Sequence, residues 1–459
     1  MLKIYDSISK KKQELKPIEE NKIKLYTCGV TVYDDCHLGH ARQWITFDVI
    51  VKYLRYRGYQ VEYVRNITDI DDKIIARANA NHESITALTT RFIQALHENS
   101  NALGALTPDA EPRATEYMPQ IIAMIQTLID KGYAYVAANG DVYYDVEKFK
   151  TYGELAQQDL EEMQAGARIE INTEKHHPLD FTLWKIAKPN EPSWESPWGA
   201  GRPGWHIECS AMSTAVLGNT FDIHAGGLDL KFPHHQNEIA QAEAATGQKF
   251  ANIWMHTGLL QVNDEKMSKS LHNFTTVREA LAEDSAEVIR YFMISSHYRS
   301  PLNYSTENMQ TARAALQRFY TALRGLPDAT EIDNANYETR FIAAMDDDFN
   351  TPEALAILFE LTREINRLKN TDIQLAAALG SLLKRLASTF GLLQDNAEHF
   401  LQMRNDTDLS NDAIEQLIAQ RNIARSNKNW QESDRIRDQL LTEGISLEDS
   451  ATETTWRKN

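Results

Sequence analysis

Residues 26–42 read YTCGVTVYDDCHLGHAR, a stretch that joins two segments of different hydrophobic periodicity. The apolar run IKLY, which ends at residue 26, is typical of a buried strand, and residues 42–59 carry apolar side chains at helical spacing. A second strand pattern, around Val61 and Tyr63, is followed by DIDDKIIARANA, which opens with acidic residues as helix N-termini often do. Strands that alternate with helices predict a parallel α/β sheet, with ligands at the carboxyl ends of its strands.

The composition indicates a soluble protein of several domains. At roughly 150 residues per domain, 459 residues suggest about three units. Its apolar runs are shorter than the ~18 residues that span a bilayer, and the start MLKIYDSISKKKQ lacks the apolar segment of a secretion signal, so we expect a cytoplasmic protein without a membrane partner. The net charge of −17 argues against nucleic-acid binding through the whole surface, but a local basic groove remains compatible with it.

The middle of the chain departs from the alternating pattern. Residues 107–201 contain a predicted helix at 118–131, a hairpin with Asn139 and Gly140 at its turn, and a loop rich in Pro and Trp, and they read as an insertion. The sheet pattern resumes at GNTFDIHAGG and ANIWMHTGLL. Beyond residue 285 amphipathic helices extend to about residue 402, and a polar tail with clustered Arg follows. The G-x-G-x-x-G match in WGAGRPGW is rejected as a dinucleotide site, because prolines surround it and no strand pattern precedes it.

HLGH, at residues 37–40, lies between the first strand and its helix. Backbone N–H groups at a helix N-terminus favour an anion, Gly39 permits close approach, and the imidazoles of His37 and His40 can donate hydrogen bonds to phosphoryl oxygens. On this tetrapeptide alone, a pair of surface histidines is an equal alternative.

Two further segments fit a nucleotide. In KMSKS, at residues 266–270, Lys266 and Lys269 can neutralise the charge that develops as pyrophosphate leaves, although such a loop alone is usually just solvated. In HAGGLDL, Gly226 and Gly227 would let an adenosine lie against the backbone, and Asp229 could accept from ribose hydroxyls. The plain alternative for HAGGLDL is a Gly-rich turn after a strand.

PHHQNE, at residues 233–238, suggests half of a metal site. With Pro233 in the first turn of a helix, His234 and Glu238 at i and i+4 share one face, whereas His235 is turned away by roughly 100° at about 3.6 residues per turn. His235 is therefore the weaker ligand candidate.

The chain has three cysteines, an odd number that argues against a disulfide framework. Cys36 adjoins His37 and is interpreted as a packing residue, which leaves Cys28 and Cys209, both in contexts that read as loops. Two thiolates with an imidazole and a carboxylate would suit zinc. Simple core cysteines are the alternative, because ligands so scattered along a chain cannot be established by spacing.

HLGH near the N-terminus and KMSKS far downstream resemble the HIGH and KMSKS signatures of class I aminoacyl-tRNA synthetases. Five longer blocks resemble, in order and essentially over the full length, the cysteinyl-tRNA synthetase family. They are CGVTVYDDCHLGHAR, NITDIDDKI, RPGWHIECSAM, HAGGLDLKFPHHQNEIAQAEA and EKMSKSLHN.

The resemblance implies a Rossmann-like α/β catalytic domain with an insertion, a helical bundle and a small C-terminal anticodon-binding domain. We expect the two catalytic halves at 1–115 and 201–260 and the connective insertion at 116–200. A linking domain with the KMSKS loop at 261–310, a tRNA-binding bundle at 311–402 and an anticodon-recognition domain at 403–459 would complete the chain.

The same resemblance implies activation of L-cysteine by ATP, with release of pyrophosphate, and transfer of cysteine to the 3′-terminal adenosine of tRNA-Cys by a monomer. One Zn2+ per chain would bind the substrate thiolate, and Mg2+ would accompany ATP. The positions that match the family's zinc ligands are Cys28, Cys209, His234 and Glu238, and those that match its amino-acid pocket are Gly29, Thr68 and Trp205. The positions that match its catalytic residues are His37, His40, Lys266 and Lys269. The expected ATP site combines these four catalytic residues with Gly226, Gly227 and Asp229.

Such a metal would explain selection against serine. A pocket that only fits cysteine separates near-isosteres by about 10²-fold, whereas zinc binds a soft thiolate far better than an alcohol. Selection then needs no editing domain, and the insertion of ~90 residues looks small for one.

The tail, RNIARSNKNWQESDRIRDQL with LEDS and TTWR, resembles the anticodon-reading end of the family. Basic side chains, a stacking indole and a carboxylate that could read base edges make up the expected tRNA contacts, Arg425, Trp430, Asp434, Arg437 and Trp456. An amphipathic helical hairpin with a solvated basic face is the alternative. Glu453 stands where the family usually has a Gly before TTW, which leaves the local turn open.

Three other functions use parts of this pattern. A cysteine ligase of the mycothiol type would share the zinc pocket and ATP signatures but lack the RNA-binding tail. A non-catalytic tRNA-binding relative would tolerate loss of HLGH or KMSKS, and both are intact. A zinc hydrolase would need an open metal position, and no H-E-x-x-H is found.

Overall fold

The computed structural model describes residues 1–158, 173–189, 191–262, 265–266 (backbone), 274–330, 335–403, 409–449 and 454–458. The chain forms two compact units, which are described separately. The first comprises Met1–Met309 and Thr339–Ala354, and the second comprises Gln310–Glu338 and Leu355–Asn459.

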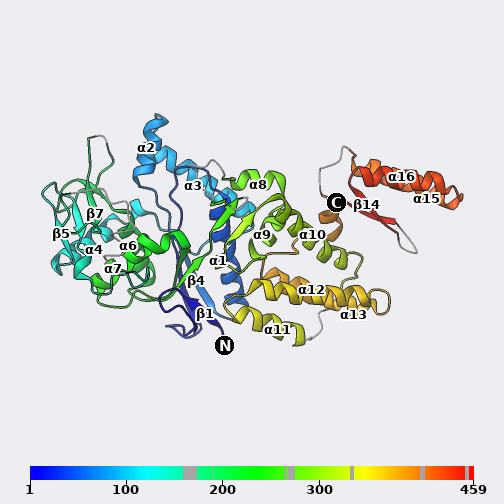
Figure 1. Ribbon diagram of the computed structural model, residues 1–459, viewed down its shortest axis with the longest axis horizontal. Helices are drawn as coiled ribbons and strands as arrows, with labels where there is room; N and C mark the ends of the chain where they lie inside the picture. Colours follow the sequence, from blue (N-terminus) through cyan, green and yellow to red (C-terminus); the bar gives the residue numbers. More distant parts are fainter. Residues whose placement is uncertain are drawn as a thin grey trace. The chain divides into compact units, whose positions relative to one another are not determined.

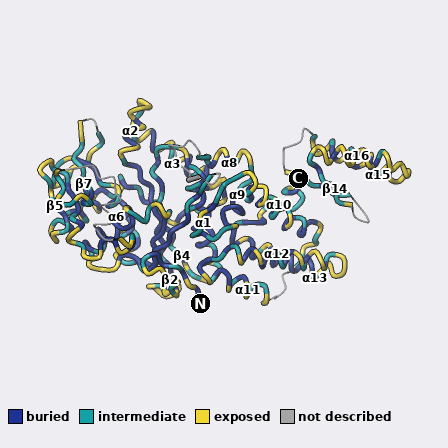
Figure 2. The backbone as a smooth tube through the Cα atoms, in the orientation of Figure 1, coloured by how far each residue is buried: buried dark blue, intermediate teal, exposed yellow. Residues whose placement is uncertain are grey.

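The first unit is built around a four-stranded parallel sheet of order β10-β9-β3-β4 (Figure 1). Its strands are β3 (Lys22–Thr27), β4 (Gln60–Arg65), β9 (Phe221–Gly227) and β10 (Ala251–Thr257). Most of their residues are buried (Figure 2), as expected for strands covered on both faces. The predicted parallel α/β sheet is confirmed.

Helix α1 (Leu38–Tyr56) connects β3 to β4 and packs against β4 and β10. Its apolar residues, among them Ile45, Phe47 and Leu54, are fully buried, which explains why a 19-residue helix forms directly after the HLGH loop. The first unit also contains α2 (Asp72–Ala80), α3 (Ile85–Ala102), α8 (Val277–Glu283), α9 (Ala286–Ile294), the hairpin of β1 (Lys3–Asp6) and β2 (Lys11–Glu14), and most of α11 (Ala335–Asp346), which begins in the second unit.

The inserted segment forms an antiparallel sheet, β5-β6-β7-β8, that lies at one end of the first unit together with α4 (Figure 1). Its elements are α4 (Met118–Asp130), β5 (Ala134–Val136), β6 (Val142–Tyr144), β7 (Phe181–Ile186) and β8 (Gly201–Pro203). The predicted hairpin is confirmed, with Gly140 at φ +89° in its turn. Strand β8 leads directly into α6 (Trp205–Leu217), so the sheet of the insertion adjoins a helix that carries candidate site residues.

The second unit is helical at first and ends in a small α+β tail. Its helices are α10 (Thr306–Leu323) and α12 (Thr351–Leu368), which both begin in the first unit, α13 (Ile373–Ser388) and α14 (Ala397–Gln402). The tail contains α15 (Asn411–Ser426), α16 (Trp430–Thr442) and the antiparallel pair β14 (Ile445–Asp449) and β15 (Thr454–Lys458). No helix within the described parts of the chain is both long enough and apolar enough to cross a bilayer.

Candidate active site

The carboxyl ends of β3 and β9 bring distant parts of the chain together. Cys28 directly follows β3, and its backbone N–H donates to the Ala225 carbonyl of β9 at 3.0 Å. Cys209 lies on α6, the helix that precedes β9, and Glu238 lies on α7 (Gln236–Thr246), the helix that follows it. Parallel pairing of β3 with β9 therefore sets the two cysteines side by side.

Cys28, Cys209, His234 and Glu238 are buried, and one ligand atom from each lies within 4.8 Å of the others. The two Sγ atoms are 3.8 Å apart, and Cys28 Sγ is 3.3 Å from Glu238 Oε1. His234 Nε2 lies 3.0 Å from the same Oε1, across the i, i+4 spacing that the sequence suggested. We call these four residues the metal cluster.

The donor set fits zinc. Two thiolate sulfurs that each lie about 2.3 Å from a tetrahedral zinc ion are about 3.8 Å from each other. The Sγ atoms of Cys28 and Cys209 have this separation. Cys209 was expected in a loop, and this expectation is wrong, because Pro203 and Gly204 only precede α6 and the cysteine lies within its second turn. His235 lies outside this group of four but forms, with Cys28 and His224, a second group of close donor atoms.

Two histidines, the half-buried His206 and the buried His224, orient the ligands of the metal cluster. His206 Nδ1 lies 2.9 Å from His234 Nδ1, and His224 Nε2 lies 2.7 Å from Glu238 Oε2. Such outer partners fix the tautomer and the ring orientation of metal-binding groups. The sequence analysis missed both residues, and their only signal was an unexplained His inside an apolar strand and one beside Trp205.

The residues of the metal cluster shift one another's pKa values. Burial raises the pKa of the Cys28 thiol, and the hydrogen bond from Cys28 lowers the pKa of Cys209 to about 6. Burial alone would lower the pKa of His234, but the Glu238 charge and Cys209 outweigh it and raise the pKa to about 10. Burial similarly opposes ionisation of Glu238, yet the neighbouring His224 and His234 hold its pKa well below the usual range. These shifts favour the thiolate of Cys209 and the carboxylate of Glu238 beside the His234 cation, whereas burial favours the neutral thiol of Cys28.

The HLGH motif lies at the N-terminus of α1 and forms its cap. His37 Nδ1 accepts from the Gly39 backbone N–H at 3.1 Å, and His40 Nδ1 accepts from the His37 N–H at 3.2 Å. The two rings stack with centroids 3.7 Å apart. Because both Nδ1 atoms accept hydrogen bonds, each neutral ring carries its proton on Nε2, from which it can donate to an anion.

The chain on either side of the KMSKS loop is anchored. At its start, the backbone of Lys266 in β12 (Glu265–Lys266) pairs with Gln261 in β11 (Leu260–Val262), and β11 also pairs with β13 (Leu302–Tyr304). After it, Leu38 N donates to Thr275 O at 3.0 Å, and Val277 N donates to Cys36 O at 2.9 Å. Backbone hydrogen bonds therefore join the HLGH segment to the chain that follows the KMSKS motif. Lys269 and the side chain of Lys266 lie outside the described residues.

The three residues expected to bind the amino acid flank the metal cluster. Gly29 follows Cys28, and a Cβ on it would lie 1.8 Å from Asn66 O, so this close approach requires glycine. Thr68 exchanges backbone hydrogen bonds with residues 30 and 32, both at 3.2 Å. The ring of Trp205, which is 38% exposed, lies 4.2 Å from that of His234.

The expected adenosine residues lie at the end of β9. A Cβ on Gly226 would lie 2.8 Å from His235 Cε1, and one on Gly227 would lie 2.4 Å from Asp229 Oδ1. Asp229 is exposed, so its carboxylate is accessible to a ligand. This geometry is compatible with a backbone surface for a nucleotide.

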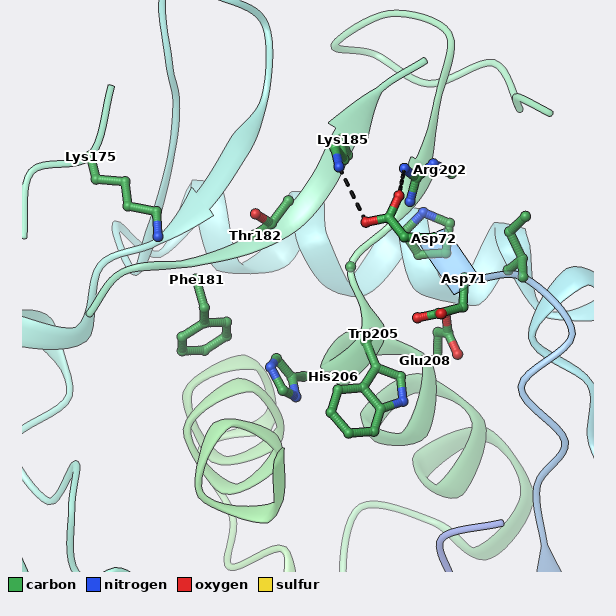
Figure 3. A pocket seen from close by; sticks show the side chains of 13 residues that line it. Asp71, Asp72, Lys175, Phe181, Thr182, Lys185, Arg202, Trp205, His206 and Glu208 are labelled. Atoms are coloured by element: carbon green, nitrogen blue, oxygen red, sulfur yellow. Dashed lines mark hydrogen bonds and ion pairs between the residues drawn. The ribbon is translucent and has the colours of Figure 1, made fainter. Parts of the chain in front are cut away.

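A cavity of about 290 Å³ opens beside the metal cluster, between β7, β8, α2 and α6 (Figure 3). It is lined by aromatic, basic and acidic side chains, including Phe181, Trp205, Lys185, Arg202, Asp71, Asp72 and Glu208. Burial raises the pKa of the Glu208 carboxyl, and the negative charges of Cys209, Asp71 and Asp69 raise it further. Trp205, His206 and Glu208 of α6 all line this cavity.

In the tail, the expected tRNA residues differ in accessibility. Trp430 is 59% exposed at the start of α16, and Arg437 pairs with Asp434 at 3.3 Å on the surface of the same helix. Arg425 pairs with Asp449 at 3.0 Å.

Trp456 requires a correction, because it is 1% exposed within a core that includes Ile414, Ile436 and Leu440. Its indole N–H donates to Glu415 Oε1 at 2.5 Å. Its side chain stabilises the tail and has no surface for a base to stack on.

Comparison with known proteins agrees with this architecture. The family model for the tRNA synthetases class I (C) catalytic domain matches residues 14–314, that for the DALR domain matches 340–394, and that for the cysteinyl-tRNA ligase anticodon binding domain matches 406–457. A Mycobacterium tuberculosis methionyl-tRNA synthetase structure covers 80% of this chain and 89% of its own, at TM-score 0.57 and 15% identity. An Agrobacterium radiobacter leucyl-tRNA synthetase complex covers 84% and 86%, at TM-score 0.59 and 11% identity. The fold is that of the class I aminoacyl-tRNA synthetases.

Curated relatives narrow this class to one family. A cysteine–tRNA ligase of Coxiella burnetii (strain Dugway 5J108-111) is 58% identical over 100% of both chains. Another, from Azotobacter vinelandii, is 59% identical over 99% of both. The chain belongs to the cysteine–tRNA ligase family and is an ATP-dependent aminoacyl-tRNA ligase.

Proposed function

We propose that this enzyme activates L-cysteine with ATP, transfers it to tRNA-Cys, and recognises cysteine through a zinc ion held by the metal cluster. The observation that supports this most directly is the convergence of two thiols, an imidazole and a carboxylate within 4.8 Å in a buried pocket. When bound, zinc would supply a Lewis acid that favours a substrate thiolate over the hydroxyl of serine.

The chain's own residues would orient the first step. The cysteine carboxylate attacks the α-phosphorus of ATP, pyrophosphate leaves, and Mg2+ serves as the counterion of the nucleotide. His37 and His40 hold phosphate oxygens through Nε2–H, in the tautomer that their Nδ1 hydrogen bonds favour. Lys266 and Lys269 neutralise the charge of the leaving pyrophosphate.

Binding of the amino acid and adenosine would use the flanking surfaces. Gly29, Thr68 and Trp205 surround the amino acid, and Gly226, Gly227 and Asp229 receive the adenosine. Catalysis would then come from positioning and charge stabilisation, after which the 2′-hydroxyl of the terminal tRNA adenosine attacks the adenylate. In the tail, the exposed Arg425, Trp430, Asp434 and Arg437 are the proposed RNA contacts. We further propose that the enzyme acts as a cytoplasmic monomer, as the family resemblance implies.

The decisive experiment is cysteine-dependent ATP–pyrophosphate exchange by metal-loaded enzyme, with serine as the control, followed by charging of tRNA-Cys. We expect exchange with cysteine, none with serine, and formation of cysteinyl-tRNA. Exchange without charging would favour a cysteine ligase that uses another acceptor, and absence of exchange would refute the proposal.

A further inference from the structure

Glu208 is a buried acid whose carboxylate is incompletely satisfied. Its side chain is 1% exposed, and among the described residues its Oε2 has no hydrogen-bond partner. Natural interiors rarely leave such a group unpaired, because its desolvation is not compensated. The residue lines the cavity beside the metal cluster, where a ligand could complete its interactions.

The other acids of this cavity already have partners. Asp71 caps α2 by accepting from the Lys73 backbone N–H at 2.7 Å, and Asp72 forms an ion pair with Arg202 (Figure 3). Among the described residues that line the cavity, Glu208 is therefore the acid that is fully buried and has an oxygen without a hydrogen-bond partner.

The position of Glu208 relates it to the amino-acid end of the active site. It lies three residues after Trp205 and directly before Cys209, both on α6. Trp205 contacts the ring of His234, and His206, which also lines the cavity, lies 2.9 Å from His234. Trp205 and His206 thus both line the cavity and contact His234 of the metal cluster.

An amino acid whose thiol reaches the metal cluster carries an ammonium group two carbons away from that sulfur. An ammonium is a compact charge with three donors, and its transfer from water into a largely enclosed site is favourable only if a charged acceptor receives it. Glu208 can supply such an acceptor from the buried wall of the cavity.

We infer that the Glu208 carboxylate binds the α-ammonium group of the amino-acid substrate. The inference rests on the proposed function and deepens it. The metal cluster recognises the thiol, and Glu208 recognises the α-amino group at the other end of the same small molecule. Thr68 and Trp205 then complete the enclosure around the α-carbon.

The test compares cysteine with β-mercaptopropionate, which is cysteine without its amino group. In pyrophosphate exchange by the wild-type enzyme, we expect β-mercaptopropionate to inhibit with an inhibition constant at least about tenfold above the KM for cysteine. In Glu208→Gln we expect the KM for cysteine to rise about 10- to 100-fold, with the inhibition constant of β-mercaptopropionate within about twofold of wild type and zinc content unchanged. Asp72→Asn, in the same cavity, should leave the ratio of the two constants as in wild type.

Several outcomes would overturn the inference. In Glu208→Gln, they are equal weakening of cysteine and β-mercaptopropionate binding, an unchanged KM for cysteine, or a loss of zinc. In the wild-type enzyme, the contradicting outcome is binding of β-mercaptopropionate as tight as that of cysteine. The last comparison needs no variant, so the inference stays testable if Glu208→Gln fails to fold. Failure of the wild-type enzyme to catalyse cysteine-dependent exchange would instead refute the proposed function.

Discussion

The sulfur atoms of Cys28 and Cys209 lie 3.8 Å apart, although 181 positions separate the two residues in the chain. Cys28 follows β3, and Cys209 lies on the helix before β9, the strand that pairs with β3. The sheet therefore creates the pair, and the whole insertion lies between them in the sequence. Residues 26–42 accordingly contribute to two centres, with Cys28 in the metal cluster and the histidines of HLGH at the start of α1.

The first prediction concerns the metal. Cys209→Ser should lower the zinc affinity at least about tenfold, because a serine oxygen is a much poorer zinc ligand than a thiolate. The zinc-to-protein ratio after dialysis, measured by mass spectrometry of the metal, checks it. Cys36→Ser is the matched control, since Cys36 is also buried but lies outside the metal cluster. An unchanged zinc ratio in Cys209→Ser would remove this residue from the ligand set.

The second prediction concerns Arg42, which is 1% exposed and donates to carbonyl oxygens of Gly258 at 3.0 Å and Ser300 at 2.5 Å. Arg42→Met would leave these acceptors unpaired, which costs about 1–3 kcal/mol for each buried group. We expect a fall of several degrees in the unfolding temperature of the first unit, by differential scanning calorimetry.

Arg55→Met is the control, because Arg55 is exposed and its ion pair with Asp109 is worth at most about 1 kcal/mol. A thermal midpoint for Arg42→Met equal to that of the control would show that other donors replace the guanidinium.

The third prediction concerns pH and the tail. Asp449 accepts from both Arg421 Nη atoms, at 2.9 and 2.7 Å, and this bonding holds the pKa of its carboxyl well below the usual range. The pKa of Asp449 is lower in the folded tail than in the unfolded chain, so the ion pair stabilises the tail above pH ~4. This stabilisation is lost as the pH falls through the pKa of the folded state. Asp449→Asn should therefore speed hydrogen exchange of β14 and β15 about tenfold at neutral pH, and less in acid.

Asp438→Asn is the matched control, because Asp438 is exposed and its contact with Arg437 is long, at 3.4 Å. If Asp449→Asn differed from wild type equally at all pH values, the charge of Asp449 would not be the cause.

The fourth prediction separates two tryptophans of the tail. Trp456→Ala should destabilise the tail by about 3–5 kcal/mol, since it empties the centre of a small core. Trp430→Ala should leave stability unchanged but weaken tRNA binding about tenfold, as expected for loss of one stacked base. Hydrogen exchange and filter binding of tRNA-Cys measure the two effects. Unchanged tRNA binding by a folded Trp430→Ala would exclude Trp430 as a contact.

Much of the fold could be predicted from hydrophobic periodicity. The strands around Leu25, Val61 and Ile223 and the helix after HLGH form where the pattern indicated, because each buries its apolar face in the same core. The hairpin turn at Gly140 could be predicted because the turn needs a positive φ, which glycine adopts readily, and Gly140 has φ +89° in the structure.

Two positions show where sequence patterns fail. The neighbouring Ser210 suggested a loop around Cys209, yet both residues lie within α6. The aromatic and basic residues of the tail suggested that Trp456 contacts RNA, whereas the pairing of β14 with β15 places it inside. Burial depends on which elements pack together, and local composition does not report it.

The amino-acid sequence contained the residue types, the order of strands and helices, and the two motifs that indicate nucleotide chemistry. Folding added the distances, because parallel pairing of β3 with β9 joins segments almost two hundred residues apart. It also added the outer partners His206 and His224 and the unpaired oxygen of Glu208, none of which has a local signature. Chemistry that depends on one chain segment could be inferred from its spacing, whereas chemistry shared among segments required their packing.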